Sequence, residues 1–400
     1  MGELKVTCEP EDVGLDSARL RRIDAHLAPY VGDGRLPGWL VLVSRRGEIA
    51  HLSTYGFRDV ASRAPVETDT LFRIYSMSKP ITSVAVMMLY EEGLLELTDP
   101  VSRHLPAFAE MRVHDKGPAA EPVRIWHLLT HTSGMVYGFQ RASAVDELYR
   151  RAGFDRGAPR GMSLAEAVDR WAELPLLFEP GTQWNYSVAT DVLGRLVEVV
   201  SGRPLDRFLS ERIFGPLGMD DTGFWIGEED AGRMATLYSA DRHRKAVAMD
   251  TRGAELRRPS FLSGGGGLIS TAGDYHRFTQ LLLRGGELDG VRLLGPRTVA
   301  YMTRNHLPGG ADLEDFGRPV FAEVSYAGMG FGLGFAVVQD AVRHRTLGSE
   351  GEFSWGGAAS TTFWVDPAEE LTVVFMTQLL PSDTHPIRSR LRQLVYQALV

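Results

Sequence analysis

The strongest constraint on the fold of this chain is a proline that directly follows the sequence Ser-Met-Ser-Lys at residues 76–79. Pro80 precedes an apolar run from Ile81 to Tyr90, and a run of that kind predicts a buried helix. Proline is tolerated in the first turn of a helix but breaks its interior. The helix must therefore begin close to Ser76.

This helix start places a serine and a lysine three positions apart. Residues i and i+3 are neighbours on one helix face, so the Ser76 hydroxyl and the Lys79 amine can approach within hydrogen-bonding distance. Only four of the 43 Lys and Arg residues are lysines, and Lys79 alone borders an apolar run. Arginine holds its proton, whereas a buried amine at the positive end of a helix is driven toward its neutral form. Because serine needs an adjacent base, the pattern predicts a serine activated by an amine.

Composition excludes several classes of function. The 400 residues carry a formal net charge of −8, which gives no reason to expect a nucleic-acid partner. The single cysteine, Cys8, excludes internal disulfides. The N-terminal sequence lacks the basic-then-apolar layout of a secretory signal, and no apolar run approaches the length of a membrane span. We therefore expect a cytoplasmic protein without a membrane partner.

Strand patterns lie near both ends of the chain, at residues 39–57, 330–338, 360–366 and 371–377. Helical patterns and polar loops dominate between them, with no strong strand from residue 81 to residue 258. This order predicts an α+β fold in which one antiparallel sheet is assembled from the two ends of the chain and flanked by helices. We expect a discontinuous α/β domain of residues 1–80 and 259–400, an inserted mainly helical domain of residues 81–258, and an active site in the cleft between them.

Tyr186 follows a Pro180-Gly181 turn and precedes an apolar helical pattern. Ser187 is positioned to cap that helix, which would put Tyr186 at a helix N-terminus, where the local dipole favours a phenolate. Taken alone, the pattern is better explained by a tyrosine that packs over the helix start.

The segment Trp-Gly-Gly-Ala at residues 355–358 is expected at the head of a strand. Glycines there allow a close approach of backbone or substrate, and a strand N–H aimed at the nucleophile could complete an oxyanion hole with the N–H of Ser76. A bulge or tight packing explains the glycines equally well.

Other motifs predict no catalytic role. The chain has no Gly-x-Ser-x-Gly, and the glycine-rich segment at 263–271 lacks the lysine of a phosphate loop and the spacing of a dinucleotide fingerprint, so we interpret it as a flexible loop. His127 and His131 stand four apart without the glutamate of a zinc protease helix. We interpret them as a packed helix end that runs into a polar loop, and no metal site is expected.

Together these motifs resemble the serine β-lactamase and penicillin-binding-protein superfamily. Ser-x-x-Lys at 76–79, Tyr-Ser at 186–187 after Phe-x-Pro-Gly, and Trp-Gly-Gly at 355–357 occur in its order, and LLTHTSG and GGGGLISTAGD are similar to segments of its class C-like branch. The resemblance spans nearly the whole chain and is greatest to the family VIII carboxylesterases. It implies a β-lactamase/transpeptidase-like fold and acyl transfer through a serine ester, without a metal or organic cofactor.

The resemblance implies a role for each candidate residue. Ser76 would be the nucleophile, Lys79 and Tyr186 would share the general-base and general-acid work, and the N–H groups of Ser76 and Ala358 would form the oxyanion hole. Tyr137, in the loop after HTSG, looks like a further active-site tyrosine of the esterase branch. The residues expected to bind substrate are Tyr137, Trp355, Gly356 and Gly357.

Two departures from the β-lactamase pattern bear on the substrate. Class C β-lactamases have Tyr-x-Asn where this chain has Tyr186-Ser187-Val188, and they have Lys-Thr-Gly where it has Trp355-Gly356-Gly357. Both changes remove a polar anchor, and the second adds a large apolar ring. We therefore expect a small neutral ester of short to medium chain length as the substrate, in preference to a β-lactam or a cell-wall peptide.

Three alternatives remain at this stage. An acyltransferase of the same fold would pass the acyl group to an alcohol or amine, and the sequence does not separate it from an esterase. A β-lactamase or D,D-peptidase is disfavoured by Val188 and Trp355, and a non-catalytic sensor is disfavoured because serine, amine and phenol are all present. The sequence also leaves open whether the protein forms a homo-oligomer.

The pairing of Ser76 with Lys79 yields a direct test. Lys79→Arg keeps the positive charge but supplies a group that does not give up its proton. Because general-base help is worth about 10²- to 10⁴-fold, kcat/KM for ester hydrolysis should fall by that order, as it should in Lys79→Ala. Near-normal activity of a folded Lys79→Arg enzyme would reduce Lys79 to a fixed charge.

Overall fold

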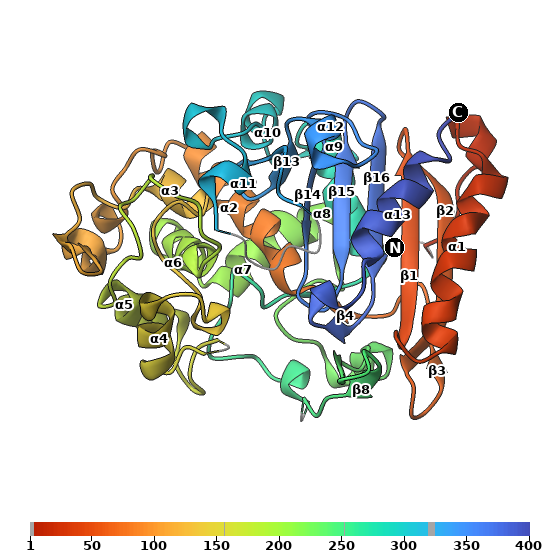
Figure 1. Ribbon diagram of the computed structural model, residues 1–400, viewed down its shortest axis with the longest axis horizontal. Coiled ribbons are helices and arrows are strands. Elements are labelled where there is room, and N and C mark those ends of the chain that lie inside the picture. Colours follow the sequence, from red (N-terminus) through yellow and green to blue (C-terminus); the bar gives the residue numbers. More distant parts are fainter. Residues whose placement is uncertain (1–3, 156, 252, 319–324) are drawn as a thin grey trace.

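The computed structural model describes residues 4–155, 157–251, 253–318 and 325–400. Its centre is an eight-stranded sheet in the order β12-β13-β14-β15-β16-β1-β2-β3, and the printed strand pairs of this sheet are all antiparallel. Strands from the start and from the end of the chain therefore lie side by side in one sheet (Figure 1). This is the α+β, β-lactamase/transpeptidase-like architecture expected from the sequence, and that prediction is confirmed.

The sheet strands have the following bounds: β1 Gly38–Arg45, β2 Glu48–Asp59, β3 Ala64–Pro65, β12 Met329–Phe331, β13 Ala336–Val338, β14 Phe353–Gly356, β15 Thr362–Asp366 and β16 Leu371–Met376. The link between the two ends of the chain is β1, whose residues are buried along its whole length and which pairs with β16 on one side and β2 on the other. In this register Leu42 lies opposite Val374. A strand buried on both faces reads as a continuous apolar run, which is why WLVLV was recognisable.

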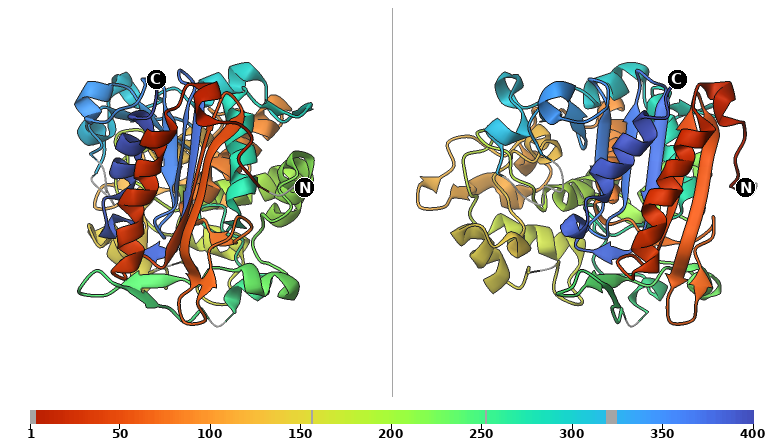
Figure 2. Two further views of the ribbon diagram at one scale, coloured as in Figure 1. Left: turned by 90° about the vertical axis from the view of Figure 1, so that its right-hand side faces the viewer. Right: turned by 45° about the vertical axis from the view of Figure 1, so that its right-hand side comes forward.

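Helices cover both faces of the sheet (Figure 2). On one face, α1 (Ser17–Gly32) and α13 (Ile387–Tyr396) pack in one apolar cluster with Trp39, Val41 and Val373. On the other face, α9 (Ala272–Leu283) and α2 (Ser78–Glu91) share a larger cluster with Leu42 and Val374. The alternation of β1 side chains between the two clusters follows from the period of two in a strand.

The segment after α2 is mainly helical and lies beside the sheet (Figure 1). Its longest helix, α6 (Ala189–Ser201), packs against α2. Around these lie α3 (Ile125–Leu129), α4 (Ala144–Arg151), α5 (Leu164–Ala172), α7 (Leu205–Leu209) and α8 (Gly215–Leu217). The proposed domain limits at residues 80 and 258 stay a prediction.

The remaining α-helices and β-strands of the described chain are short. They are β4 (Phe72–Arg73), β5 (Arg112–Val113), β6 (Gly117–Pro118), β7 (Tyr238–Ala240), β8 (Ala246–Ala248), β9 (Ile269–Ser270), β10 (Glu287–Leu288), β11 (Val291–Arg292), β17 (Leu379–Leu380), α10 (Pro296–Met302), α11 (Leu313–Phe316) and α12 (Ala341–His344). Strands of two or three residues, such as β7 and β8, are too short to show a period in the sequence, and no strand was expected there.

The segment 330–338, expected as strand, is a hairpin of β12 and β13. Gly334 interrupts it with a φ of 100°, a conformation that favours glycine over residues with side chains. The apolar residues on either side of the turn conceal the break in the sequence pattern.

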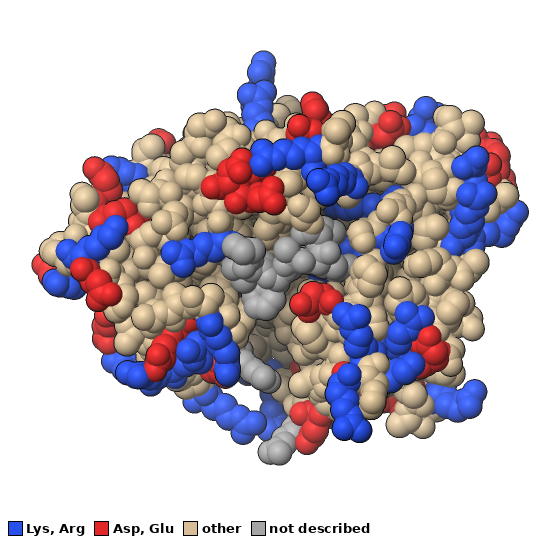
Figure 3. All heavy atoms as spheres, viewed as in Figure 1, with Lys and Arg blue, Asp and Glu red and all other residues tan. Residues whose placement is uncertain are grey.

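The surface is mixed in charge. On the face shown in Figure 3, acidic and basic side chains are interspersed. Within the part of the chain that the structure describes, no helix combines the length and the apolar character needed to cross a membrane.

The central position of β1 predicts its contribution to stability. Leu42 is 0% exposed, so Leu42→Ala should lower the free energy of unfolding by about 2–5 kcal/mol through lost burial and a new cavity. Leu94 is 48% exposed, and Leu94→Ala is the matched control, with an expected change within about 0.5 kcal/mol. Urea titration of both variants measures the difference, and equal losses would contradict the assignment of β1 to the core.

Candidate active site

The serine of the Ser-x-x-Lys motif lies in a tight turn that leads into α2. Tyr75–Met77 form one 3₁₀ turn, and α2 continues from Ser78 with Pro80 in its first turn. The predicted helix start close to Ser76 is therefore confirmed. Tyr75 has a φ of 45°, a left-handed conformation that costs a non-glycine residue about 1–3 kcal/mol and recurs at functional sites. Ser76 itself is half-buried and thus reachable.

Lys79 is buried, and its amine contacts three oxygen atoms. The Nζ atom lies 3.4 Å from Ser76 Oγ, 3.1 Å from the Tyr137 hydroxyl and 2.6 Å from the backbone oxygen of Gly265. An ammonium donates to all three, whereas a neutral amine donates to two and accepts a proton from a hydroxyl. The same geometry therefore suits the amine before and after a proton transfer from Ser76.

The Tyr186 ring also lies close to the Lys79 amine. The Lys79 Nζ atom stands 4.6 Å from the centre of the Tyr186 ring, and the Tyr186 hydroxyl lies 3.4 Å from Trp355 Nε1. The helix that follows begins at Ala189, and its assigned N-cap is Val188. The Ser187 Oγ accepts from the N–H of Ala189 at 3.3 Å, so Ser187 caps the first turn as expected.

Aromatic rings surround the amine. Tyr137 and Trp355 each lie 5.4 Å from Tyr186 between ring centres, and the Phe331 ring lies 5.4 Å from Trp355. Burial, with Asp191 and Tyr186 nearby, raises the pKa of Tyr137 well above its usual value. Tyr137 is thus held as a neutral phenol, and the wall of the site is apolar.

The two histidines of the WHLLTH segment pack as expected. His127 lies in α3 and its Nδ1 accepts from the Arg124 N–H at 3.0 Å, which confirms the packed helix end. His131 has a role that the sequence did not indicate, since its ring centre lies 4.9 Å from that of Tyr186. Burial and the neighbouring Lys79 lower the pKa of His131, so a neutral imidazole supports the Tyr186 ring.

The Trp-Gly-Gly segment lies at the end of β14, not at the head of a strand as expected, because the chain turns after Gly356. β14 contacts the turn that carries Ser76. A Cβ on Gly357 would stand 2.4 Å from the backbone oxygen of Ile74, so this contact requires a glycine. Among the described residues, the N–H groups of Ser76 and Ala358 donate to no backbone carbonyl. Both are available to a bound oxyanion, although their roles stay predictions.

The glycine-rich segment interpreted as a flexible loop is a fixed part of the site, and that interpretation was wrong. Thr82 donates to the Gly264 oxygen at 2.8 Å, and the Leu268 N–H donates to Ser78 Oγ at 3.1 Å. These bonds fasten the segment to α2, so the Gly265 oxygen is held where it meets Lys79. Glycine composition alone does not distinguish a mobile loop from one pressed against a helix.

Sequence reasoning also missed Asp191. It is 3% exposed on α6, and its Oδ1 accepts from Ser263 Oγ at 2.6 Å and from the Gly265 N–H at 2.9 Å. Burial raises the pKa of Asp191, while Lys79 and these hydrogen bonds oppose that shift. Asp191 thereby links α6 to Gly265, the residue whose carbonyl oxygen holds the amine. The sequence carried little signal, because the residues on the same helix face at i+3, i+4 and i+7 are Gly194, Arg195 and Glu198.

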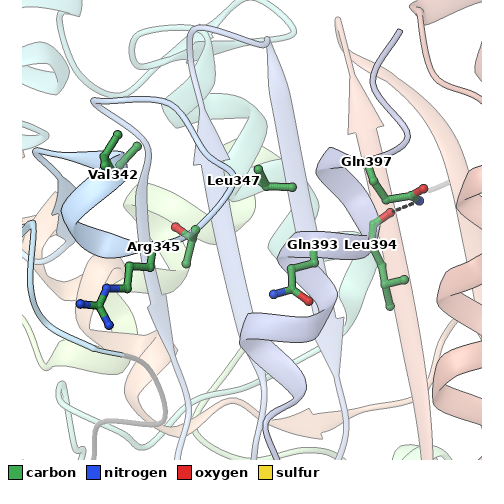
Figure 4. Close-up of a pocket in the computed structure, with 8 residues that line it drawn as sticks. Val342, Arg345, Leu347, Gln393, Leu394 and Gln397 are labelled. Atoms are coloured by element: carbon green, nitrogen blue, oxygen red, sulfur yellow. Dashed lines mark hydrogen bonds between the residues drawn. The ribbon is translucent and has the colours of Figure 1, made fainter.

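A separate surface hollow lies between α12 and α13 (Figure 4). It shares no lining residue with the site around Ser76 and is lined by Ala341, Val342, Arg345, Thr346, Leu347, Gln393, Leu394 and Gln397. Among the described residues, no group of three or more His, Cys, Asp or Glu side chains could hold a metal ion.

Comparison with known proteins identifies relatives along nearly the whole chain. The family model described as Beta-lactamase matches residues 23–397. Esterase EstB of Burkholderia gladioli is 34% identical over 97% of this chain and 98% of its own length. Protein Rv1367c of Mycobacterium tuberculosis is 37% identical over 87% of both chains. The solved structure of EstCE1, a hydrolase with promiscuous acyltransferase activity, has a TM-score of 0.81 and 29% identity, and covers 95% of this chain and 99% of that one.

The link through Asp191 can be tested without knowledge of the substrate. Asp191→Ala removes the acceptor of two hydrogen bonds and loosens Gly265, the residue whose carbonyl oxygen holds the Lys79 amine. Because small displacements of a reacting group cost up to about 100-fold, fluorophosphonate labelling of Ser76 should slow by about 10- to 100-fold. Asp169→Ala, on an exposed position of α5, is the control. Unchanged labelling of folded Asp191→Ala would show that Asp191 does not hold the site.

Proposed function

The chain belongs to the Beta-lactamase family, and from that premise we propose that it is a serine carboxylesterase that hydrolyses short- to medium-chain esters. The observation that carries the proposal is the position of the buried Lys79 amine, 3.4 Å from the Ser76 hydroxyl and surrounded by aromatic rings. A nucleophile next to a buried base is the arrangement that covalent catalysis requires.

In the first half of the reaction, the neutral Lys79 amine takes the proton of Ser76 as Oγ attacks the ester carbonyl carbon. The N–H groups of Ser76 and Ala358 stabilise the oxyanion that forms. When the tetrahedral intermediate collapses, the bond to the alkoxide breaks and the Tyr186 phenol protonates the leaving group. The Lys79 ammonium, which faces the Tyr186 ring, returns a proton to the phenolate.

The second half repeats these steps with water. Water attacks the acyl-enzyme carbonyl as its proton passes to the Lys79–Tyr186 pair, and Ser76 is released with its proton restored. The acyl group leaves as a carboxylic acid, so the balance is one ester and one water to one acid and one alcohol. No proton acceptor other than Lys79 and Tyr186 is required.

The walls of the site support a neutral substrate. Val188 is buried where class C β-lactamases carry an amide, and the Trp355 ring packs on Tyr186 where they carry a lysine. A substrate carboxylate or amide would therefore lose hydration without gaining these partners. The names of EstB and EstCE1, an esterase and a hydrolase, support the same reaction class.

An acyltransferase is the second candidate, and one observation favours it. The EstCE1 structure, similar over 95% of this chain, is described as a hydrolase with promiscuous acyltransferase activity. The two reactions share the acyl-enzyme and differ only in whether water or another alcohol or amine attacks it.

Steady-state kinetics test the proposal. The protein should hydrolyse p-nitrophenyl butyrate and cleave nitrocefin with a far lower kcat/KM. Ser76→Ala should reduce ester hydrolysis to background, and Tyr186→Phe should lower kcat/KM by about 10²- to 10⁴-fold because it removes a proton donor. Tyr301→Phe, at an exposed tyrosine on α10, is the matched control and should leave both constants unchanged.

Product analysis separates the rivals. With short alcohols added, an esterase yields mainly the free acid, whereas a predominance of new ester would favour the acyltransferase. Efficient nitrocefin turnover with no ester hydrolysis would overturn the proposal in favour of a β-lactamase. Failure to react with either would favour a non-catalytic sensor.

A further inference from the structure

An arginine at the start of α13 lies directly over the turn that follows β14. The Arg388 Nη2 atom donates to the backbone oxygen of Gly357 at 2.8 Å and to that of Thr361 at 3.0 Å. These two carbonyls flank the turn between β14 and β15, which is also closed by the Gly357 N–H donating to the Thr361 oxygen at 2.9 Å. One guanidinium therefore joins both ends of the turn.

The first glycine of the Trp-Gly-Gly segment, Gly356, makes room for this contact. A Cβ built on Gly356 would lie 2.6 Å from the Cζ and Nη2 atoms of Arg388. A side chain at residue 356 would therefore push the guanidinium away from the turn. The segment had been interpreted as a place of close approach, and at Gly356 the group that approaches is this arginine.

The carbonyl that Arg388 binds belongs to the peptide group whose other end is the Ala358 N–H. A peptide group is planar and its C=O and N–H point in opposite directions, so fixing the Gly357 oxygen fixes the direction of the Ala358 N–H. The Ser360 N–H also donates to the Gly357 oxygen, at 3.2 Å. The peptide is thus held on its carbonyl side by two donors, one of them charged.

Charge adds to this orientation. A hydrogen bond from a cation to a carbonyl is shorter and stronger than a neutral one, and hydrogen bonds in a chain polarise one another. A guanidinium on the Gly357 oxygen draws electron density toward that oxygen and makes the Ala358 N–H a better donor. The Ala358 N–H, in turn, donates to no backbone carbonyl of the described chain and lies at an exposed residue.

We propose that Arg388 is a positioning residue that orients and polarises the Gly357–Ala358 peptide for stabilisation of the oxyanion. The inference rests on the proposed esterase reaction and adds to it a residue that does not touch the substrate. It acts where negative charge develops, so it should affect the transition state more than the binding of the ground-state ester.

The test compares variants of Arg388 with one of its exposed neighbour. Arg388→Met removes the two hydrogen bonds to the turn, Arg388→Lys keeps the charge with a single donor centre, and Arg390→Met is the matched control on the same helix. With p-nitrophenyl butyrate, Arg388→Met should lower kcat by about 10- to 100-fold and change KM less than about threefold, because a misdirected oxyanion donor costs less than a missing one. Arg388→Lys should fall between it and the wild type, and Arg390→Met should match the wild type.

The affinity for a transition-state analogue is the second measurement, because a merely structural role of Arg388 would not weaken it selectively. The affinity for a trifluoromethyl ketone, which forms a tetrahedral oxyanion on serine, should fall by the same factor as kcat/KM. The affinity for a butyramide of the same size, bound as a neutral ground-state analogue, should stay constant. A third variant, Arg388→Ala, removes the guanidinium and leaves space for a small cation. Added ethylguanidinium should restore part of kcat in this variant.

The outcomes separate this inference from the proposed function. An inactive wild type would overturn the proposed esterase and, with it, this role. A wild type that hydrolyses the ester together with a folded Arg388→Met variant of unchanged kcat would overturn the role of Arg388 alone. A parallel loss of ketone and amide affinity, or a loss of kcat equal in Arg388→Met and Arg390→Met, would also overturn it. If Arg388→Met does not fold, Arg388→Lys decides by the same split between kcat and KM.

Discussion

The structure of the site depends on one buried amine. Lys79 lies in the first turn of α2, and its buried side chain faces the glycine-rich segment. A buried amine is tolerated only where oxygen atoms accept its hydrogen bonds. The Gly265 carbonyl is the nearest of these oxygens, at 2.6 Å, and Asp191 on α6 holds the N–H of the same residue. The contact with Ser76 is longer, at 3.4 Å, so the amine is anchored on one side and available to the serine on the other.

Segments far apart in the chain must meet around this amine, and the sheet brings them together. The central pairing of β1 with β16 joins the two ends of the chain, and β14, separated from β16 by β15, reaches the turn that carries Ser76. The left-handed backbone of Tyr75 and the close contact of Gly357 with Ile74 are consequences of that approach. Strain of this kind is retained where the surrounding structure fixes it, here by β14 on one side and α2 on the other.

The sequence predicted what is encoded locally. The helix start at Ser76 follows from a proline and an apolar run, and the i, i+3 pairing with Lys79 follows from helix geometry. The central strands β1 and β16 were recognisable because they are buried on both faces. What could not be predicted depends on contacts between distant residues: Asp191 with the Gly265 N–H, and Arg388 with the Gly357 oxygen. Both side chains bind backbone groups, and such contacts leave no pattern of side chains in the sequence. The glycines that permit these contacts also resemble, in sequence, the glycines of a mobile loop.

The central claim is that Ser76 carries the acyl group with Lys79 as its base. Rapid-quench mass spectrometry tests it most directly, by following the peptide that contains Ser76 after the enzyme is mixed with p-nitrophenyl butyrate. The account predicts a butyryl adduct on Ser76 that forms and decays at the rate of turnover in the wild type and forms far more slowly in Lys79→Ala. An adduct on another residue, or one that forms equally fast without Lys79, would contradict it.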